Sequence, residues 1–167
     1  MNSDSLPQPD ETPYQRLQAL QITLGAPRQP VANYLPAVLE GSLLYLSGQG
    51  PVGDGIRHTG KVGDTVTAKE AYEHARLTGI NLLSVMHAAL GDLGRVRQVV
   101  KLLGMVNAAP NFDNHPAVIN GCSDLLVAVF GDKGRHARSA IGVGSLPGQI
   151  TVEIELIVAV DPGTKSA

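Results

Sequence analysis

The sequence predicts an α+β fold in which helices pack on one face of a β-sheet. Three observations lead to this class. The chain has 167 residues, which suggests one domain. Two long segments show helical periodicity, and strand-like segments precede, separate and follow them. We expect the domain to span residues 13–163, with a mobile polar tail at 1–12 and a short tail at 164–167.

The N-terminal part of the domain predicts one short helix followed by two strands. Thr12 is a good N-cap and Pro13 suits the first helical position, so a helix is expected at 13–24. Leucines at helical spacing give it one apolar face, with which it would dock on the body of the protein. Strand patterns follow at 34–39 and 42–47.

The rest of the chain supplies the two main helices and the remaining strands. Thr67 and Glu70 form a capping box at the start of the clearest helix. The predicted elements are a helix at 68–90, a strand at 95–107, a helix at 115–130, and strands at 137–143 and 150–160. With both helices on one face, the other face of the sheet would be bare in a monomer. We therefore expect subunits to associate through that face.

The composition restricts the classes of function. A net charge of −2, with no Trp, two Phe and four Tyr, argues against a nucleic-acid-binding protein. Cys122 is the only cysteine, so no internal disulfide can form and a reducing compartment is expected. Neither a secretory signal nor an apolar run of about 18 residues is visible. These features predict a soluble cytoplasmic protein.

Polar residues in apolar segments are the candidates for chemistry. Arg138 interrupts a small, apolar strand, and its guanidinium matches a carboxylate. From the residues alone, a salt bridge with Glu153 or Glu155 is at least as well supported as an anion site. These two carboxylates share one strand face, for which a solvated surface is the better interpretation and acid–base chemistry the alternative. Asn120, within an apolar helix, could offer donors and an acceptor to a cleft.

Other patterns point away from metals and common catalytic motifs. The five histidines show no metal-ligand spacing and Cys122 has no thiol companion, so no metal site is expected. A P-loop and a G-x-S-x-G elbow are both absent. The glycine-rich segment 47–51 favours a plain turn, and close approach of a ligand to its backbone is the alternative.

Two motifs resemble those of a known family. The run Ala137-Arg138-Ser139 continuing to Leu146-Pro147, followed by Val152-Glu153-Ile154-Glu155, resembles the signature of the RidA family, also called YjgF. The segment Ser47-Gly48-Gln49-Gly50-Pro51-Val52 is similar to that family's S-G-Q-x-P-V. Tyr34 and Asn120 match its early tyrosine and the asparagine of its second helix. The resemblance covers about residues 31–160 and indicates a longer branch of the family.

The resemblance implies a chorismate-mutase-like fold, with an extra N-terminal helix here, and a homotrimer with ligand clefts between subunits. It also implies an enamine/imine deaminase that hydrolyses 2-imino acids, such as 2-iminobutyrate and 2-iminopropionate, to 2-keto acids and ammonia. Such a reaction needs no cofactor. The implied roles are carboxylate binding by Arg138, activation of water by Glu153, and lining of the cleft by Tyr34, Gly48, Asn120 and Ala140.

Three positions depart from the family pattern. Ala140 replaces a cysteine, Gly50 replaces a larger aliphatic residue, and Gly142 stands where a glutamate often falls. These changes could widen the cleft and alter the preferred substrate. Two other functions are open: a non-catalytic trimer that binds a small carboxylate metabolite, and the endoribonuclease or translation-inhibitor activity for which family members have also been named. The acidic charge balance makes the last of these the least favoured.

Overall fold

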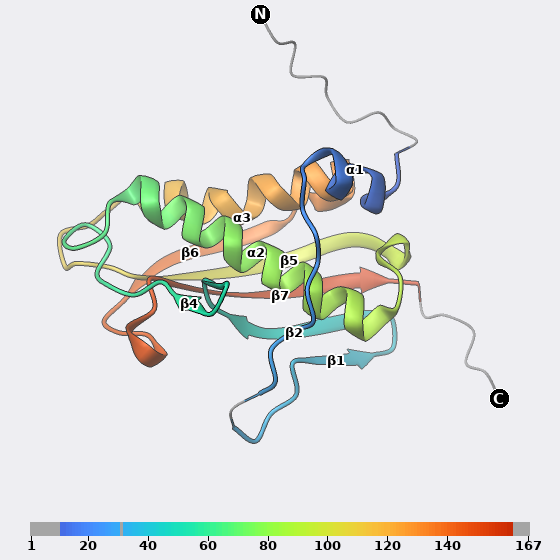
Figure 1. The fold of residues 1–167 in the computed structure, drawn as a ribbon, viewed down its shortest axis with the longest axis horizontal. Helices are drawn as coiled ribbons and strands as arrows, with labels where there is room; N and C mark the ends of the chain where they lie inside the picture. Colours follow the sequence, from blue (N-terminus) through green and yellow to red (C-terminus); the bar gives the residue numbers. More distant parts are fainter. Residues whose placement is uncertain (1–10, 31, 162–167) are drawn as a thin grey trace, which may run out of the picture.

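The computed structural model describes residues 11–30 and 32–161 (Figure 1). Its centre is a five-stranded sheet in the order β1-β2-β7-β5-β6. The strands are β1 (Ala37–Glu40), β2 (Leu43–Gln49), β5 (Val96–Asn107), β6 (Ala137–Val143) and β7 (Val152–Val160). Neighbouring strands are antiparallel except β5 and β6, which are parallel. Of the two predicted tails, only Glu11, Thr12 and no residue beyond Asp161 fall within the described ranges.

Two long helices cover one face of this sheet. Helix α2 (Ala68–Leu90) and helix α3 (His115–Phe130) lie side by side over the strands (Figure 1). The predicted α+β class, a mixed sheet with two main helices on one face, is confirmed. Within the described part of the chain, no helix is both long and apolar enough to cross a membrane.

The smaller elements connect the main ones. They are α1 (Pro13–Ala19), β3 (Val52–Gly53), β4 (Ile56–Arg57) and three 3₁₀ turns, η1 (Leu93–Arg95), η2 (Gly131–Gly134) and η3 (Pro147–Gln149). Strands β3 and β4 form a two-stranded hairpin within a segment whose glycines predict a loop. The hairpin packs against α2.

The N-terminal helix is shorter than predicted, because α1 ends at Ala19 rather than at Leu24. Gln21 adopts a left-handed conformation with φ of 57°, and the N–H of Ile22 donates to the carbonyl of Leu17 at 2.9 Å. This is the Schellman motif, which closes a helix and usually has glycine at the left-handed position. The leucine periodicity continued past a stop that glutamine, not glycine, provides.

The two faces of the sheet differ in character. Along β7 the aliphatic side chains are buried under the helices, whereas Glu153 and Glu155 lie on the other face. This confirms the alternation predicted for the last strand. The uncovered face also carries exposed apolar side chains, among them Val38 and Tyr45. We call this surface the open face.

Helix α3 comes unusually close to its neighbours. A Cβ at Gly104 of β5 would lie 2.7 Å from side-chain carbons of Ile119. A Cβ at Gly121 of α3 would overlap the backbone carbonyl of Tyr72 in α2. Glycine at these two positions therefore sets both the height of α3 above the sheet and its distance from α2.

We predict that Gly121→Ala destabilises the protein by about 2 kcal/mol or more, because the added methyl group forces the two helices apart. The gain in helix propensity from alanine, about 1 kcal/mol, offsets only part of this cost. Urea unfolding followed by circular dichroism, at one fixed protein concentration, measures the change. Gly25→Ala is the control, since a Cβ at Gly25 meets nothing within 4 Å. Equal midpoints for the two variants would contradict the close approach.

Candidate functional site

Arg138 is held by two neutral groups on α3. Its Nη1 donates to Oδ1 of Asn120 at 2.8 Å and to Oγ of Ser123 at 3.1 Å. The side chain is half-buried, and within residues 11–30 and 32–161 no carboxylate forms an ion pair with it. The salt bridge with Glu153 or Glu155, which the residues alone left open, is thus not formed in this chain. The positive charge stays available to an external anion.

A short hydrogen-bond chain orients the arginine from behind. Oγ of Ser123 lies 3.0 Å from Nε2 of His136, whose Nδ1 lies 2.6 Å from the carbonyl oxygen of Gly134. Burial lowers the pKa of His136, which favours the neutral imidazole at neutral pH. Because a carbonyl can only accept, we assign the ring proton to Nδ1. Ser123 then donates to Nε2 and accepts from Arg138.

Ser123 was not a candidate from the sequence. It lies three residues after Asn120 on α3, so both side chains project from one side of the helix. That spacing is the signal that could have identified it. Ala140 lies two residues after Arg138 on β6 and therefore on the same, helix-covered side of the strand, where it is half-buried.

A second cluster lies on the open face. The pairing of β2 with β7 shifts register between Leu46 and Gln49, and this bulge turns Gly48 toward Glu153. A Cβ at Gly48 would overlap Oε1 of Glu153, so only glycine allows this approach. Burial, and secondarily the charge of Glu155, raise the pKa of Glu153. This carboxyl therefore holds its proton to a higher pH than a solvated glutamate does.

Tyr34 belongs with this second cluster. It lies in the segment before β1, is 45% exposed, and lines a cavity of about 220 Å³ together with Gly48, Gly50 and Arg57. The structure thus divides the six predicted site residues into two groups. Arg138, Asn120 and Ala140 lie on the helix side of the edge strand β6, and the other three lie at or near the open face.

One chain does not bring the two groups together. Strand alternation points Arg138 toward the helices and Glu153 away from them. Strand β5 also lies between β6 and β7 in the sheet. A site that uses both residues has to be completed by a second copy of the chain.

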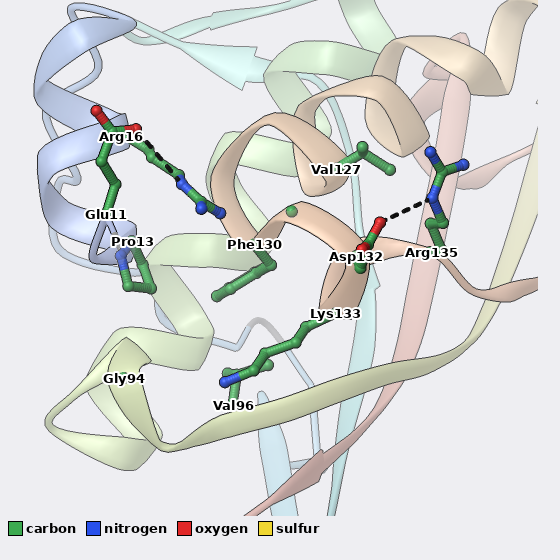
Figure 2. Close-up of a pocket in the computed structure, with 11 residues that line it drawn as sticks. Glu11, Pro13, Arg16, Gly94, Val96, Val127, Phe130, Asp132, Lys133 and Arg135 are labelled. Atoms are coloured by element: carbon green, nitrogen blue, oxygen red, sulfur yellow. Dashed lines mark hydrogen bonds and ion pairs between the residues drawn. The ribbon is translucent and has the colours of Figure 1, made fainter. Parts of the chain in front are cut away.

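A cavity of about 520 Å³ beside α1 looks polar but is not the better candidate (Figure 2). Figure 2 shows that its charged side chains face one another: Nε of Arg16 lies 3.8 Å from Glu11, and Arg135 pairs with Asp132 at 3.3 Å. Arg16 also donates to the carbonyl of Val129 at 3.4 Å, near the end of α3. These contacts dock α1 on the C-terminal end of α3.

The remaining candidate chemistry is inert or absent. Cys122 is fully buried, and burial raises the pKa of its thiol to about 12, so it stays protonated. In the part of the chain that the structure describes, no group of three or more His, Cys, Asp or Glu side chains could hold a metal ion.

Comparisons with known proteins agree on one family. The model described as "YjgF/chorismate_mutase-like, putative endoribonuclease" matches residues 14–156. Protein TCP17 of Trypanosoma cruzi is 45% identical over 144 residues, which cover 85% of this chain and 90% of that protein. A crystal structure of a protein of unknown function from Agrobacterium tumefaciens superimposes with a TM-score of 0.83 at 44% identity, covering 89% of this chain and 92% of the other. The 2-iminobutanoate/2-iminopropanoate deaminase of Dermatophagoides farinae is 28% identical over 137 residues, or 80% of this chain and 90% of that enzyme.

We predict that Glu153→Gln stabilises the protein at neutral pH and not in acid. Folding raises the pKa of Glu153, so its cost to stability is absent below the ordinary glutamate pKa of about 4.3 and appears as pH rises through the raised value. The gain at pH 7.5 should be below about 1 kcal/mol, because solvent screens a half-exposed carboxylate. Urea unfolding at the two pH values measures it, with exposed Glu40→Gln as the control. A gain that is independent of pH would contradict the desolvation of Glu153.

Proposed function

Because the chain belongs to the YjgF family, also called RidA, we propose that it is an enamine/imine deaminase that hydrolyses 2-imino acids to 2-keto acids and ammonia. The chorismate-mutase-like fold predicted from the sequence is confirmed by the family match. A relative named 2-iminobutanoate/2-iminopropanoate deaminase supports the activity at 28% identity. The observation that carries the proposal is Arg138, a half-buried cation held by neutral acceptors and open to a carboxylate.

In the proposed reaction Arg138 binds the substrate carboxylate. Asn120 and Ser123 fix its guanidinium before the substrate arrives, so little ordering remains at binding. The imine carbon is already electrophilic, and a water adds to it while Glu153 accepts the proton of that water. Glu153 then gives the proton to the nitrogen as the C–N bond breaks and ammonia leaves. A raised pKa brings Glu153 closer to the pH range in which one carboxyl can both accept and return a proton.

We infer a homotrimer with its clefts between subunits. In each cleft, Arg138, Asn120 and Ala140 of one subunit would face Glu153, Gly48 and Tyr34 of the next. Two features support this: the two groups lie on opposite faces of the sheet, and the open face carries exposed Val38, Tyr45 and Ile141. The single free thiol agrees with the cytoplasm as the proposed compartment.

A second candidate function uses the same groups without turnover. A trimer that binds a small carboxylate metabolite through Arg138 would show saturable binding of 2-keto acids and no hydrolysis of imines. The family description also names an endoribonuclease. The net charge of −2 does not favour a polyanion as substrate.

We predict that Arg138→Ala lowers kcat/KM for 2-iminobutyrate by about 100-fold or more, because it removes a bidentate charged contact and the orientation that this contact provides. The imine is generated in situ by an amino-acid oxidase, and keto-acid formation is followed with lactate dehydrogenase. Arg97→Ala, on the exposed side of β5, is the matched control. A wild-type protein that folds and assembles but accelerates no imine hydrolysis would refute the deaminase proposal.

We predict that two inactive variants restore activity when they are mixed. In oligomers formed from equal amounts of Arg138→Ala and Glu153→Gln subunits, about one quarter of the shared clefts would pair an intact Arg138 with an intact Glu153. Co-expression with two different affinity tags isolates the mixed oligomers, and the same assay measures turnover. Mixed oligomers without activity would place both residues of each site in one chain.

A further inference from the structure

A second polar pocket lies at the other end of the groove that contains Arg138. Its volume is about 530 Å³, and its lining includes Lys61, Phe112, His115, Gly142 and Gly144. It is formed where α3 begins and β6 ends. Asn120 and Ser123 contact Arg138 further along the same two elements. The pocket and the arginine are therefore two ends of one α3–β6 groove.

His115 occupies the space of a missing side chain. A Cβ at Gly142 would overlap Nε2 of His115, so the imidazole lies against β6 only because position 142 is glycine. The ring of Phe112 holds it edge-on, with centroids 5.2 Å apart. Position 142 is also where the family pattern often has a glutamate. In this chain the end of the groove presents an imidazole from the helix in place of a carboxylate from the strand.

Lys61 adds a positive charge to the same pocket. Its Nζ donates to the carbonyl oxygens of Gly144 and, at 3.5 Å, Ala108, which fix the ammonium at the rim. Of the carboxylates in residues 11–30 and 32–161, none forms an ion pair with Lys61; Asp64 and Asp113, nearby in sequence, are both exposed. Two carbonyls take two of the three N–H donors of the ammonium, and the third can reach a ligand.

The spacing of the two ends fits a short ligand. His115 precedes Asn120 by five residues on α3, which is about 7.5 Å at 1.5 Å per residue. Asn120 marks the position of the Arg138 guanidinium. A ligand with one anionic group on Arg138 and a second near His115 and Lys61 would therefore have the length of a succinate or glutarate skeleton.

We propose that the preferred substrates are imines of dicarboxylic 2-keto acids, with the second carboxylate bound by Lys61 and His115. This rests on the proposed function, since it names the substrate class of the same site. Arg138 holds the carboxylate next to the imine, as for any 2-imino acid. The Lys61–His115 end then selects the anionic side chain over the short aliphatic one of 2-iminobutyrate, because a charge-assisted contact replaces an apolar one.

The test compares two imines on the full-length protein. L-Aspartate oxidase generates 2-iminosuccinate, with malate dehydrogenase as the coupling enzyme, and 2-iminobutyrate is assayed as above. We expect kcat/KM for 2-iminosuccinate to exceed that for 2-iminobutyrate by about 10-fold or more. Lys61→Met and His115→Phe should each remove most of that preference and leave 2-iminobutyrate within about 3-fold of wild type. Exposed Lys69→Met is the control for the loss of one lysine.

Binding of the products separates failure of the substrate class from failure of the reaction. Calorimetry measures 2-ketoglutarate and 2-ketobutyrate on the wild type, Lys61→Met and His115→Phe. Tighter 2-ketoglutarate binding that depends on Lys61 and His115 supports the subsite even if no imine is hydrolysed. Hydrolysis of 2-iminobutyrate that depends on Arg138, with no preference for the dicarboxylate and no effect of the two substitutions, would overturn the subsite and leave the proposed function intact.

Discussion

The position of α3 on the sheet is the constraint on which both ends of the candidate groove depend. Gly104 lets Ile119 sit directly on β5, and Gly121 lets the helix backbone touch α2. A packed interior leaves little freedom once two such contacts are made, so the rotation of α3 about its axis is set as well. That rotation turns Asn120 toward β6. The arginine, its two acceptors and the distal pocket therefore share one structural cause.

The electrostatics of Arg138 follow from its place at the sheet edge. A half-buried guanidinium loses part of its hydration, and in most proteins a nearby carboxylate compensates for that loss. Here the compensation comes from an amide oxygen and a hydroxyl, which satisfy N–H donors without neutralising the charge. The nearest candidate partners in the sequence, Glu153 and Glu155, face the other way because of strand alternation. A net positive charge is thus preserved for something outside the chain, and the complementary acid is displayed to a different neighbour.

The sequence was sufficient for elements with strong local signals. The helix at 115–130 and the strand at 137–143 have the predicted bounds, since a proline start, a glycine end and an unbroken apolar pattern mark them. The end of α1 was wrong because Gln21 takes a conformation usually reserved for glycine. In the groove, Arg138 was visible as a lone cation in an apolar strand. Lys61 was not, because its carbonyl partner Gly144 lies 83 residues away and only the tertiary fold brings the two together.

The exchange at position 142 shows how a family of this kind can change substrates without altering its carboxylate clamp. Arg138 contacts the part that every 2-imino acid has in common, so it contributes affinity and orientation but no selection among side chains. Selection has to come from groups further along the groove, and a polar group left unpaired by the wrong substrate discriminates more strongly than a missing methylene does. Glycine at 142 admits His115 beside Lys61, whereas a glutamate there would exclude the imidazole and repel an anionic side chain. One small residue on a strand thereby sets the charge at the far end of the groove.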